Sequence, residues 1–239
     1  MKIICIGDLH GRSEWREILR KEVDANKIIF LGDYFDSSDP SITPEMCKDN
    51  FEILLRLKSN EPSKYHLLLG NYDFQYIDNR SSSFCRRYSA SLQEYAYDRL
   101  IELVKLGKLN VCYNFEGLLF SHAGVTATWS DTNGIVKENL QDSINLRFLD
   151  RLNEFSFTGS DPDGDDISQS PLWIRPKALS EDPISVPYQI VGHTPSKEIT
   201  SIKAHGTEIW LCDALGQGQY LEIKITEEGK IFTPKNIKS

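Results

Sequence analysis

Short apolar runs that end in glycine recur along the 239-residue chain, and they predict buried β-strands. The first three such runs are Lys2–Ile6, Ile28–Leu31 and Tyr65–Leu69. Between the first two, the apolar spacing at residues 13–22 predicts a helix with Ser13 as its N-cap. A strand–helix–strand order implies parallel pairing with a right-handed crossover, so we expect an α/β fold.

The same reasoning extends to the rest of the chain and indicates one domain over residues 1–239. We expect irregular structure at 74–90 and a loop at 155–170. The first of these segments carries Arg80, Arg86 and Arg87 and is either a specificity loop or a solvated connection. The further elements expected are helices from Pro44 to about Lys58, at 91–107 and at 138–153, and strands at 109–113, 118–121, 188–191, 208–212 and 220–225.

Composition narrows the classes of protein that fit. Hydrophobic residues make up 40% and charged residues 26%, as in ordinary globular proteins. A net charge of −8 argues against a nucleic-acid or acidic-membrane partner, because both need a basic surface. The five cysteines form no CxxC pair, and the chain shows neither a signal peptide nor a membrane-spanning run. We therefore expect reduced thiols and a cytoplasmic location.

Polar side chains of the metal-ligating type follow the predicted strands. In open α/β sheets the carboxyl ends of the strands form one rim, where ligands bind. Each such residue alone could be an ordinary turn or core residue, but together they predict a metal site. Oxygen and nitrogen donors without thiolates suit Mn²⁺, with Fe, Zn²⁺ or Mg²⁺ as alternatives. Six donors are too many for one catalytic ion, so we expect two ions sharing Asp33. The donors are Asp8, His10, Asp33, Asn71, His122 and His193.

Five ordered motifs, spread from Ile3 to about Leu221, resemble those of the calcineurin-like metallophosphoesterases. The resemblance implies a four-layer sandwich of two mixed β-sheets flanked by helices. It also implies that Asp8 and His10 hold the first metal, that Asp33 bridges, and that the other three donors hold the second. The expected activity is hydrolysis of a phosphate ester by in-line attack of an activated water. The motifs are GDLHG, GDYFD, GNYD, SHAG and GHTP.

Two details resemble the phosphoprotein-phosphatase branch, of bacterial and phage type, which includes diadenosine tetraphosphate hydrolases. Pro195 stands where nuclease and phosphodiesterase branches carry a second histidine in the last motif. Arg175, within QSPLWIRP, resembles the arginine that grips the substrate phosphate, although a surface ion pair is the alternative. The expected substrate is a phosphomonoester, a phosphoprotein or a nucleotide.

Two positions depart from the family pattern. Ser37 follows Asp36 where the branch has a phosphate-binding arginine, and Tyr72 replaces the general-acid histidine that Asp73 would orient. A phenol has a pKa near 10, and loss of a general acid typically lowers the rate about 10²–10⁴-fold. The expected catalytic set is Asp36, Tyr72, Asp73 and Arg175. The alternatives are a weakened or inactive metal- or phosphate-binding module and, less favoured, a nucleotide-anhydride hydrolase or nuclease.

Overall fold

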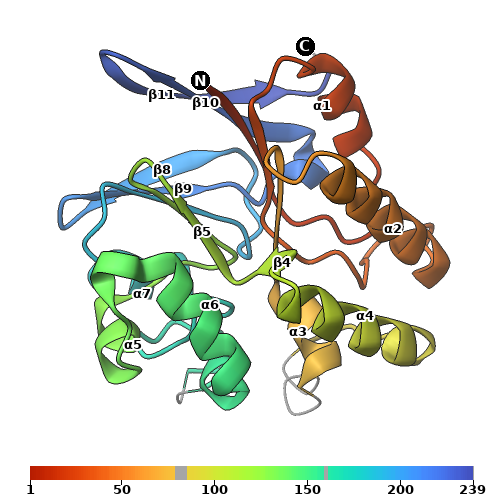
Figure 1. Ribbon diagram of the computed structural model, residues 1–239, viewed down its shortest axis with the longest axis horizontal. Helices are drawn as coiled ribbons and strands as arrows, with labels where there is room; N and C mark the ends of the chain where they lie inside the picture. Colours follow the sequence, from red (N-terminus) through yellow and green to blue (C-terminus); the bar gives the residue numbers. More distant parts are fainter. Residues whose placement is uncertain (79–84, 159–160, 239) are drawn as a thin grey trace.

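Two mixed β-sheets face each other in the computed structural model, which describes residues 1–78, 85–158 and 161–238 (Figure 1). The first sheet has the order β11-β10-β1-β2-β3-β4, and the second has the order β5-β6-β7-β9-β8. The first sheet consists of β1 (Lys2–Ile6), β2 (Lys27–Phe30), β3 (Tyr65–Leu68), β4 (Leu109–Asn110), β10 (Gln219–Thr226) and β11 (Gly229–Asn236). The second consists of β5 (Cys112–Phe115), β6 (Leu118–Ser121), β7 (Tyr188–Val191), β8 (Thr200–Ala204) and β9 (Thr207–Leu211).

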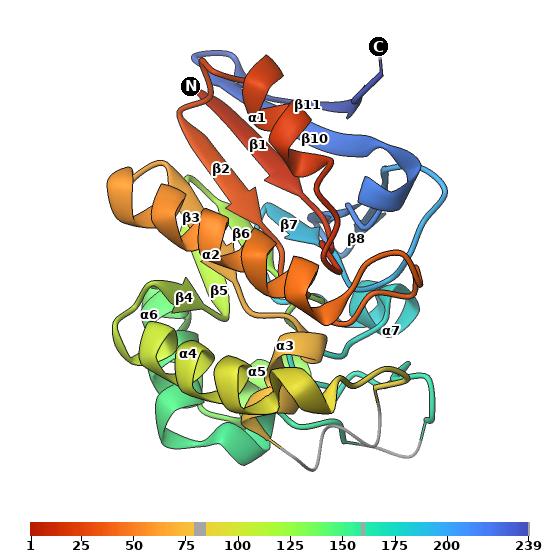
Figure 2. The same cartoon turned by 90° about the vertical axis from the view of Figure 1, so that its right-hand side faces the viewer.

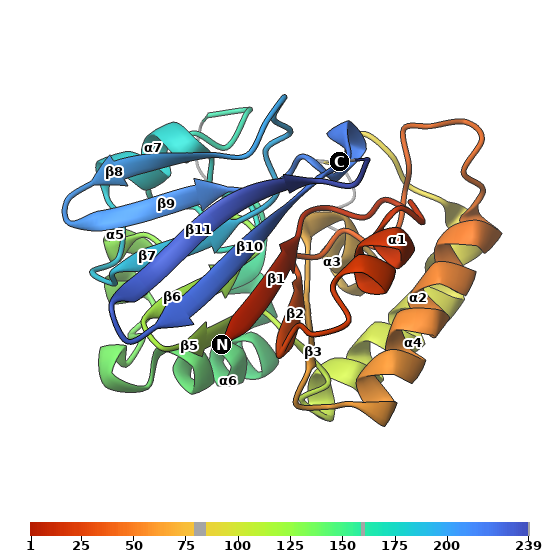
Figure 3. The same ribbon diagram turned by 90° about the horizontal axis from the view of Figure 1, so that it is seen from above.

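Helices cover the outer face of each sheet, which gives the layered sandwich that the sequence predicts. Figure 3 shows α1, α2 and α4 beside the first sheet and α5, α6 and α7 beside the second. The fold class is therefore confirmed. The helices are α1 (Trp15–Lys21), α2 (Pro44–Asn60), α3 (Asn71–Ile77), α4 (Gln93–Lys105), α5 (Ala127–Thr132), α6 (Leu140–Asp150) and α7 (Pro176–Glu181).

The central strands are buried on both faces, which explains their unbroken apolar runs. In β1, Ile3 and Cys5 pack between the two sheets, whereas Ile4 and Ile6 pack under the helices. Strands β1 to β4 run parallel, as do β6, β7 and β9. Their carboxyl ends therefore gather at one rim, and Figure 2 shows the arrowheads of β1 and β2 directed toward α3.

Three local predictions differ from the structure. Helix α3 begins at Asn71, inside the motif, because Asp73 accepts the Gly70 N–H and caps it. Helix α1 begins at Trp15, and Ser13 is not its N-cap. The strand expected at 109–113 divides at Val111 between the two sheets, with the Asn145 side chain accepting the backbone N–H groups at the break.

Some elements have no counterpart in the sequence prediction, namely α5, α7, β8 and β11. They are short or amphipathic edge segments, where pattern alone is weak. Arg80 lies outside the described residues. The five cysteines, all within the described residues, are free thiols. Within the described ranges, no helix has the length and apolar character needed to cross a membrane.

Candidate active site

The rim of the sheets holds a cavity of about 290 Å³ that brings the predicted donors together. One donor atom from each of Asp8, His10 and Asp33 lies within 4.8 Å of the others. His122 is fully buried against Asn71, at the floor of this group. The residues that line the cavity are Asp8, His10, Asp33, Asn71, Tyr72, Arg86, Arg87, Trp173, Arg175, His193, Pro195 and Asp213.

Asp33 lies between two groups of donors. One carboxylate oxygen is 3.5 Å from His10 Nε2, and the other is 3.6 Å from His122 Nε2. The second group centres on the Asn71 side-chain oxygen, which is 2.8 Å from His122 Nε2 and 3.0 Å from His193 Nδ1. A carboxylate in this position can serve both groups at once.

Each of the three imidazoles is oriented by a backbone carbonyl. A carbonyl only accepts hydrogen bonds, so the ring nitrogen beside it carries the proton and the other nitrogen presents a lone pair to the centre. Burial lowers the pKa of His10 to about 4 and that of His122 to about 3, so both are neutral at pH 7. The pairs are His10 Nδ1 with Phe35, His122 Nδ1 with Leu31 and His193 Nε2 with Trp173, at 3.0, 2.8 and 3.0 Å.

This arrangement fits a cation. The lone pairs of His122 and His193 face the Asn71 oxygen with no proton between them, and such contacts are repulsive without a positive charge. Asp8 and Asp33 are only 3% and 1% exposed, and burial raises the pKa of both carboxyls. Isolated buried charges are unfavourable unless they are paired or bind a metal. The nitrogen and oxygen donors suit divalent Mn, Fe or Zn.

Three of the donor residues have left-handed backbone conformations. The φ angles are 46° at His10, 54° at Asp33 and 64° at His193. Such angles are unfavourable for residues with a side chain and persist only where surrounding contacts impose them. His193 N–H donates to an Asp8 carboxylate oxygen at 3.0 Å, and His10 N–H donates to the Asp33 carbonyl at 2.6 Å. The strained backbone conformations of the donor residues are thus stabilised by hydrogen bonds between the donor residues themselves.

Two glycines leave room for the carboxylates. A Cβ atom at Gly70 would lie 2.1 Å from an Asp33 carboxylate oxygen, and one at Gly192 would lie 2.3 Å from an Asp8 oxygen. Both distances are far below van der Waals contact. The glycines of GNYD and GHTP are therefore required by the close approach of the acids.

Asp73 does not contact the side chain of Tyr72, which corrects the expected orienting role. Its two carboxylate oxygens accept the backbone N–H groups of Asp33, Tyr34 and Gly70 at 2.8, 2.8 and 2.9 Å. The residue is fully buried, and burial raises the pKa of its carboxyl to about 7. Asp73 positions the loop that carries Asp33.

Asp36 is also turned away from the cavity that the described residues line. Its carboxylate accepts the Tyr76 hydroxyl at 2.7 Å and the Gln75 side-chain amide at 2.6 Å. The same Tyr76 hydroxyl accepts the backbone N–H of Ser89 at 3.2 Å. A direct catalytic role for Asp36 is therefore not what its contacts indicate; it joins its loop to α3 and to residues 85–89.

Tyr72 occupies the cavity wall where a proton donor was expected. Its ring meets the His10 ring edge-on at 5.1 Å, and the Arg87 guanidinium carbon lies 4.9 Å from its centroid. Burial raises the pKa of the phenol above its ordinary value. A group with so high a pKa is poorly matched to proton transfer at neutral pH.

Arg175 is held at the cavity by three hydrogen bonds. Its Nε donates to the Asp163 carbonyl at 2.8 Å, and Nη1 donates to the His193 carbonyl and the Thr194 hydroxyl, both at 3.1 Å. Asp163 belongs to the loop at 155–170. This loop therefore contacts the arginine through a backbone carbonyl. Among the described residues Nη2 has no hydrogen-bond partner, so it can bind a ligand.

Asp213 was not singled out in the sequence. It follows β9 and lines the cavity beside Asp8. Burial raises the pKa of its carboxyl to about 6. A signal existed, because an aspartate directly after a buried strand repeats the pattern of the other donors. No glycine adjoins Asp213, and for that reason it did not resemble the other strand-end motifs.

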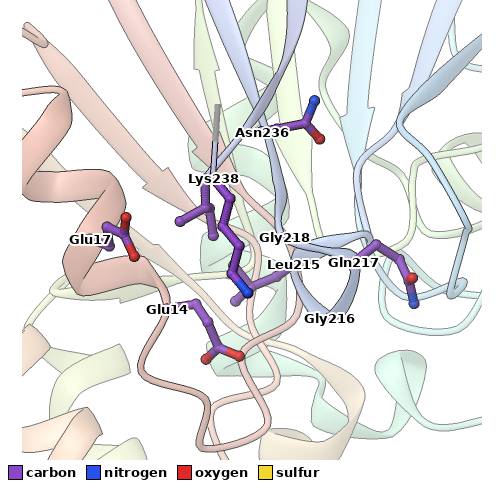
Figure 4. Close-up of a pocket in the computed structure, with 9 residues that line it drawn as sticks. Glu14, Glu17, Leu215, Gly216, Gln217, Gly218, Asn236 and Lys238 are labelled. Atoms are coloured by element: carbon purple, nitrogen blue, oxygen red, sulfur yellow. The ribbon is translucent and has the colours of Figure 1, made fainter.

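A second cavity, of about 660 Å³, lies between the start of α1 and the C-terminal residues (Figure 4). Glu14, Glu17 and Lys238 are among its lining residues. None of the six candidate donors lines it. Despite its size, it offers no comparable set of ligands.

Comparison of the sequence with known proteins identifies a relative. A curated relative, a probable serine/threonine-protein phosphatase of Encephalitozoon cuniculi, is 26% identical over 184 residues, which cover 74% of this chain and 34% of the relative. The chain therefore spans about a third of the length of that protein.

Solved structures share the fold. A cold-active protein-tyrosine phosphatase of Shewanella aligns with a TM-score of 0.58 at 17% identity, covering 99% of this chain and 80% of the other. A Saccharomyces cerevisiae protein serine/threonine phosphatase aligns with a TM-score of 0.57 at 15% identity, with the same 99% and 80% coverage. The family model of the calcineurin-like phosphoesterases matches residues 1–211. Taken with the motifs and the two-sheet fold, this match shows that the chain belongs to the calcineurin-like phosphoesterase family.

Proposed function

We propose that the protein is a metal-dependent phosphatase, a hydrolase of phosphate esters with a dinuclear metal centre. The observation that carries the proposal is the convergence of unprotonated donor atoms around Asp33 and Asn71, beside an arginine-lined cavity. The family membership and the phosphatase-like relative support it.

In this proposal Asp8 and His10 hold one ion and Asn71, His122 and His193 hold the other, with Asp33 shared. Mn²⁺ is the first candidate, with Fe, Zn²⁺ and Mg²⁺ as alternatives. Two such ions lower the pKa of a bound water and neutralise charge on phosphoryl oxygens. Each imidazole is held by a backbone carbonyl at one ring nitrogen. The lone pair of its other nitrogen is thereby directed at the candidate metal centre.

The other residues bind and orient the substrate. Arg175, fixed through Nε and Nη1, presents Nη2 to a phosphoryl oxygen, where a guanidinium forms a strong charge-assisted bond. Tyr72 is poorly matched to the role of general acid at neutral pH, because burial raises the pKa of its phenol further. The enzyme should therefore favour phosphomonoesters whose leaving groups depart without a proton.

Both sheets contribute donors, so we infer that residues 1–239 act as one domain. We assign the chain to the phosphoprotein-phosphatase branch, on Pro195 and on the phosphatase-like relative. Five free thiols favour a reducing compartment such as the cytoplasm.

The test is turnover of p-nitrophenyl phosphate by the full chain with Mn²⁺, with EDTA, and in the Asp33→Asn variant. We expect turnover with Mn²⁺ only, and its loss in the variant. Turnover that persists in EDTA-treated, metal-free protein would contradict the proposal.

A non-catalytic module that binds metal and phosphate is the second candidate, favoured by Tyr72 at the general-acid position. Elemental analysis separates the two. Two bound ions without turnover of any phosphomonoester would support the binding module, whereas two ions with turnover support the phosphatase.

A further inference from the structure

Two residues, Ser37 and Tyr72, depart from the family motifs, and an arginine from another segment stacks on one of them. Ser37 cannot supply the positive charge of the arginine that it replaces, and its hydroxyl accepts the Asp39 N–H at 3.0 Å. Tyr72, the other departure, lies under the guanidinium of Arg87, whose Cζ is 4.9 Å from the ring centroid. The guanidinium of Arg87 therefore brings a positive charge to the cavity from a different segment, and the ring of Tyr72 supports it.

The position and the unpaired Nε of Arg87 suit the binding of an anion. It lines the cavity together with the donors and Arg175. Its Nε is buried and has no hydrogen-bond partner among the described residues. A buried donor without a partner is unfavourable, so such atoms call for a ligand.

The segment that carries Arg87 is anchored to the site on both sides of this residue. On one side, the Cys85 thiol contacts the Asn71 carbonyl at 3.7 Å. On the other side, Ser89 N–H donates to the Tyr76 hydroxyl at 3.2 Å, and that hydroxyl donates to Asp36.

We propose that Arg87 is a substrate-binding residue that contacts the phosphoryl oxygens, and that Tyr72 is the platform that positions it. This inference rests on the proposed phosphatase function and names the residue that takes over from the arginine missing at position 37.

The physical basis is the planar guanidinium. It presents hydrogen-bond donors in a fixed fork that matches phosphate oxygens, and it stacks on an aromatic face at the same time. With Arg175 on another wall, two guanidinium groups would bind one dianionic phosphate. Arg87 then makes a monoester dianion a better ligand than a diester monoanion.

The experiment measures binding of inorganic phosphate to the Mn²⁺-loaded full chain by titration calorimetry, which requires no turnover. Arg87→Ala should weaken phosphate binding about 10- to 100-fold, the range expected for a lost charge-assisted hydrogen bond. Tyr72→Phe keeps the ring and should bind within about threefold of the parent, whereas Tyr72→Leu should lose roughly tenfold. Arg20→Ala, which removes an exposed charge on α1, is the matched control and should bind like the parent.

The double variant Arg87→Ala, Tyr72→Leu separates positioning from general destabilisation. If Tyr72 acts through Arg87, the double variant binds phosphate no more weakly than Arg87→Ala alone. Additive losses, a parent-like Arg87→Ala, or a parent chain that binds no phosphate would each overturn the inference. Phosphate binding that depends on Arg87 in a chain without turnover would uphold it and reject only the proposed function.

Melting temperatures and metal contents accompany each variant. A parent-like melting temperature and two bound ions in Arg87→Ala assign its affinity loss to the missing guanidinium. Should Arg87→Ala not fold, Arg87→Lys replaces it: Lys keeps the charge without the fork and should bind phosphate with intermediate affinity.

Discussion

Asp33 takes part in the site through its carboxylate and its backbone. The carboxylate faces His10 and His122, while its N–H donates to Asp73 and its carbonyl accepts from His10. The left-handed φ of 54° makes this combination possible, because it turns the backbone toward Asp73 while the side chain stays in the cavity. One residue therefore determines the geometry of both donor groups.

The Asp33→Asn variant should lose metal from both sites, whereas Asp8→Asn should lose chiefly one ion. The amide of Asn has the shape of the carboxylate but not its charge, so it cannot be shared between two cations. Elemental analysis of dialysed protein gives the number of ions per chain. Loss of one ion in both variants would exclude sharing by Asp33.

We expect position 72 to determine which leaving groups depart readily in the proposed reaction. The parent should hydrolyse an activated aryl phosphate far faster than an alkyl phosphate, because general-acid catalysis contributes about 10²–10⁴-fold where a proton is needed. Tyr72→His should raise the hydrolysis rate of the alkyl phosphate more than that of the aryl phosphate. The ratio of the aryl rate to the alkyl rate should therefore fall. An equal change on both substrates, at unchanged metal content, would contradict this prediction.

At the scale of elements, the strand ends and the N-terminus of α3 form one packed unit. Gly70 precedes α3, Asp73 caps it, and the same carboxylate holds the loop after β2. The cap of this helix therefore also sets the position of Asp33. A substitution at Gly70 would therefore displace Asp33, although Gly70 itself is not one of the candidate metal ligands.

Gly70→Ala should abolish binding of both ions, because the new Cβ would meet Asp33 at 2.1 Å. Its φ of −99° is allowed for alanine, so the effect is steric and not conformational. Gly107→Ala is the control: Gly107 has φ +63° at the end of α4, with nothing within 4 Å of the added Cβ.

The control should lower stability by about 1 kcal/mol from the left-handed conformation, measured by urea unfolding, and retain both ions. Calorimetric titration with Mn²⁺ compares the two variants. Unchanged metal binding in Gly70→Ala would show that the carboxylate can move aside.

At the scale of the whole molecule, the site joins the two sheets. Asp8 and Asp33 follow strands of the first sheet, whereas His122 and His193 follow strands of the second. An ion held by both sets therefore links the two layers, in addition to the apolar packing between them.

Removal of metal should lower the melting temperature. An ion that binds only the folded chain stabilises it by about 2.7 kcal/mol at a hundredfold excess over Kd. For a chain of this length that corresponds to roughly 5–10 °C. Differential scanning calorimetry with Mn²⁺ and with EDTA measures the shift, and Asp33→Asn should show none. An equal shift in Asp33→Asn would place the stabilising ion elsewhere.

The sequence by itself determined the central buried strands and the order of the site motifs. Buried parallel strands need continuous apolar runs, and a carboxylate packed against backbone needs glycine, so both leave local marks such as IIFLGD and the glycine of GNYD. The six donors belong to these marks, and the structure brings them together at one rim.

Only the tertiary structure decided which atoms face the cavity. Two of the three partners of Asp73 lie on the loop after β2, 39 and 40 residues away, and Asp36 bonds to Tyr76 across 40 residues. Arg87 and Asp213 enter from segments without a motif. Hydrogen bonds and stacking between distant loops have no sequence period, because they depend on how the layers place the loops and not on the local backbone. For that reason the pattern could name the donors but could not foresee that Tyr72 supports an arginine.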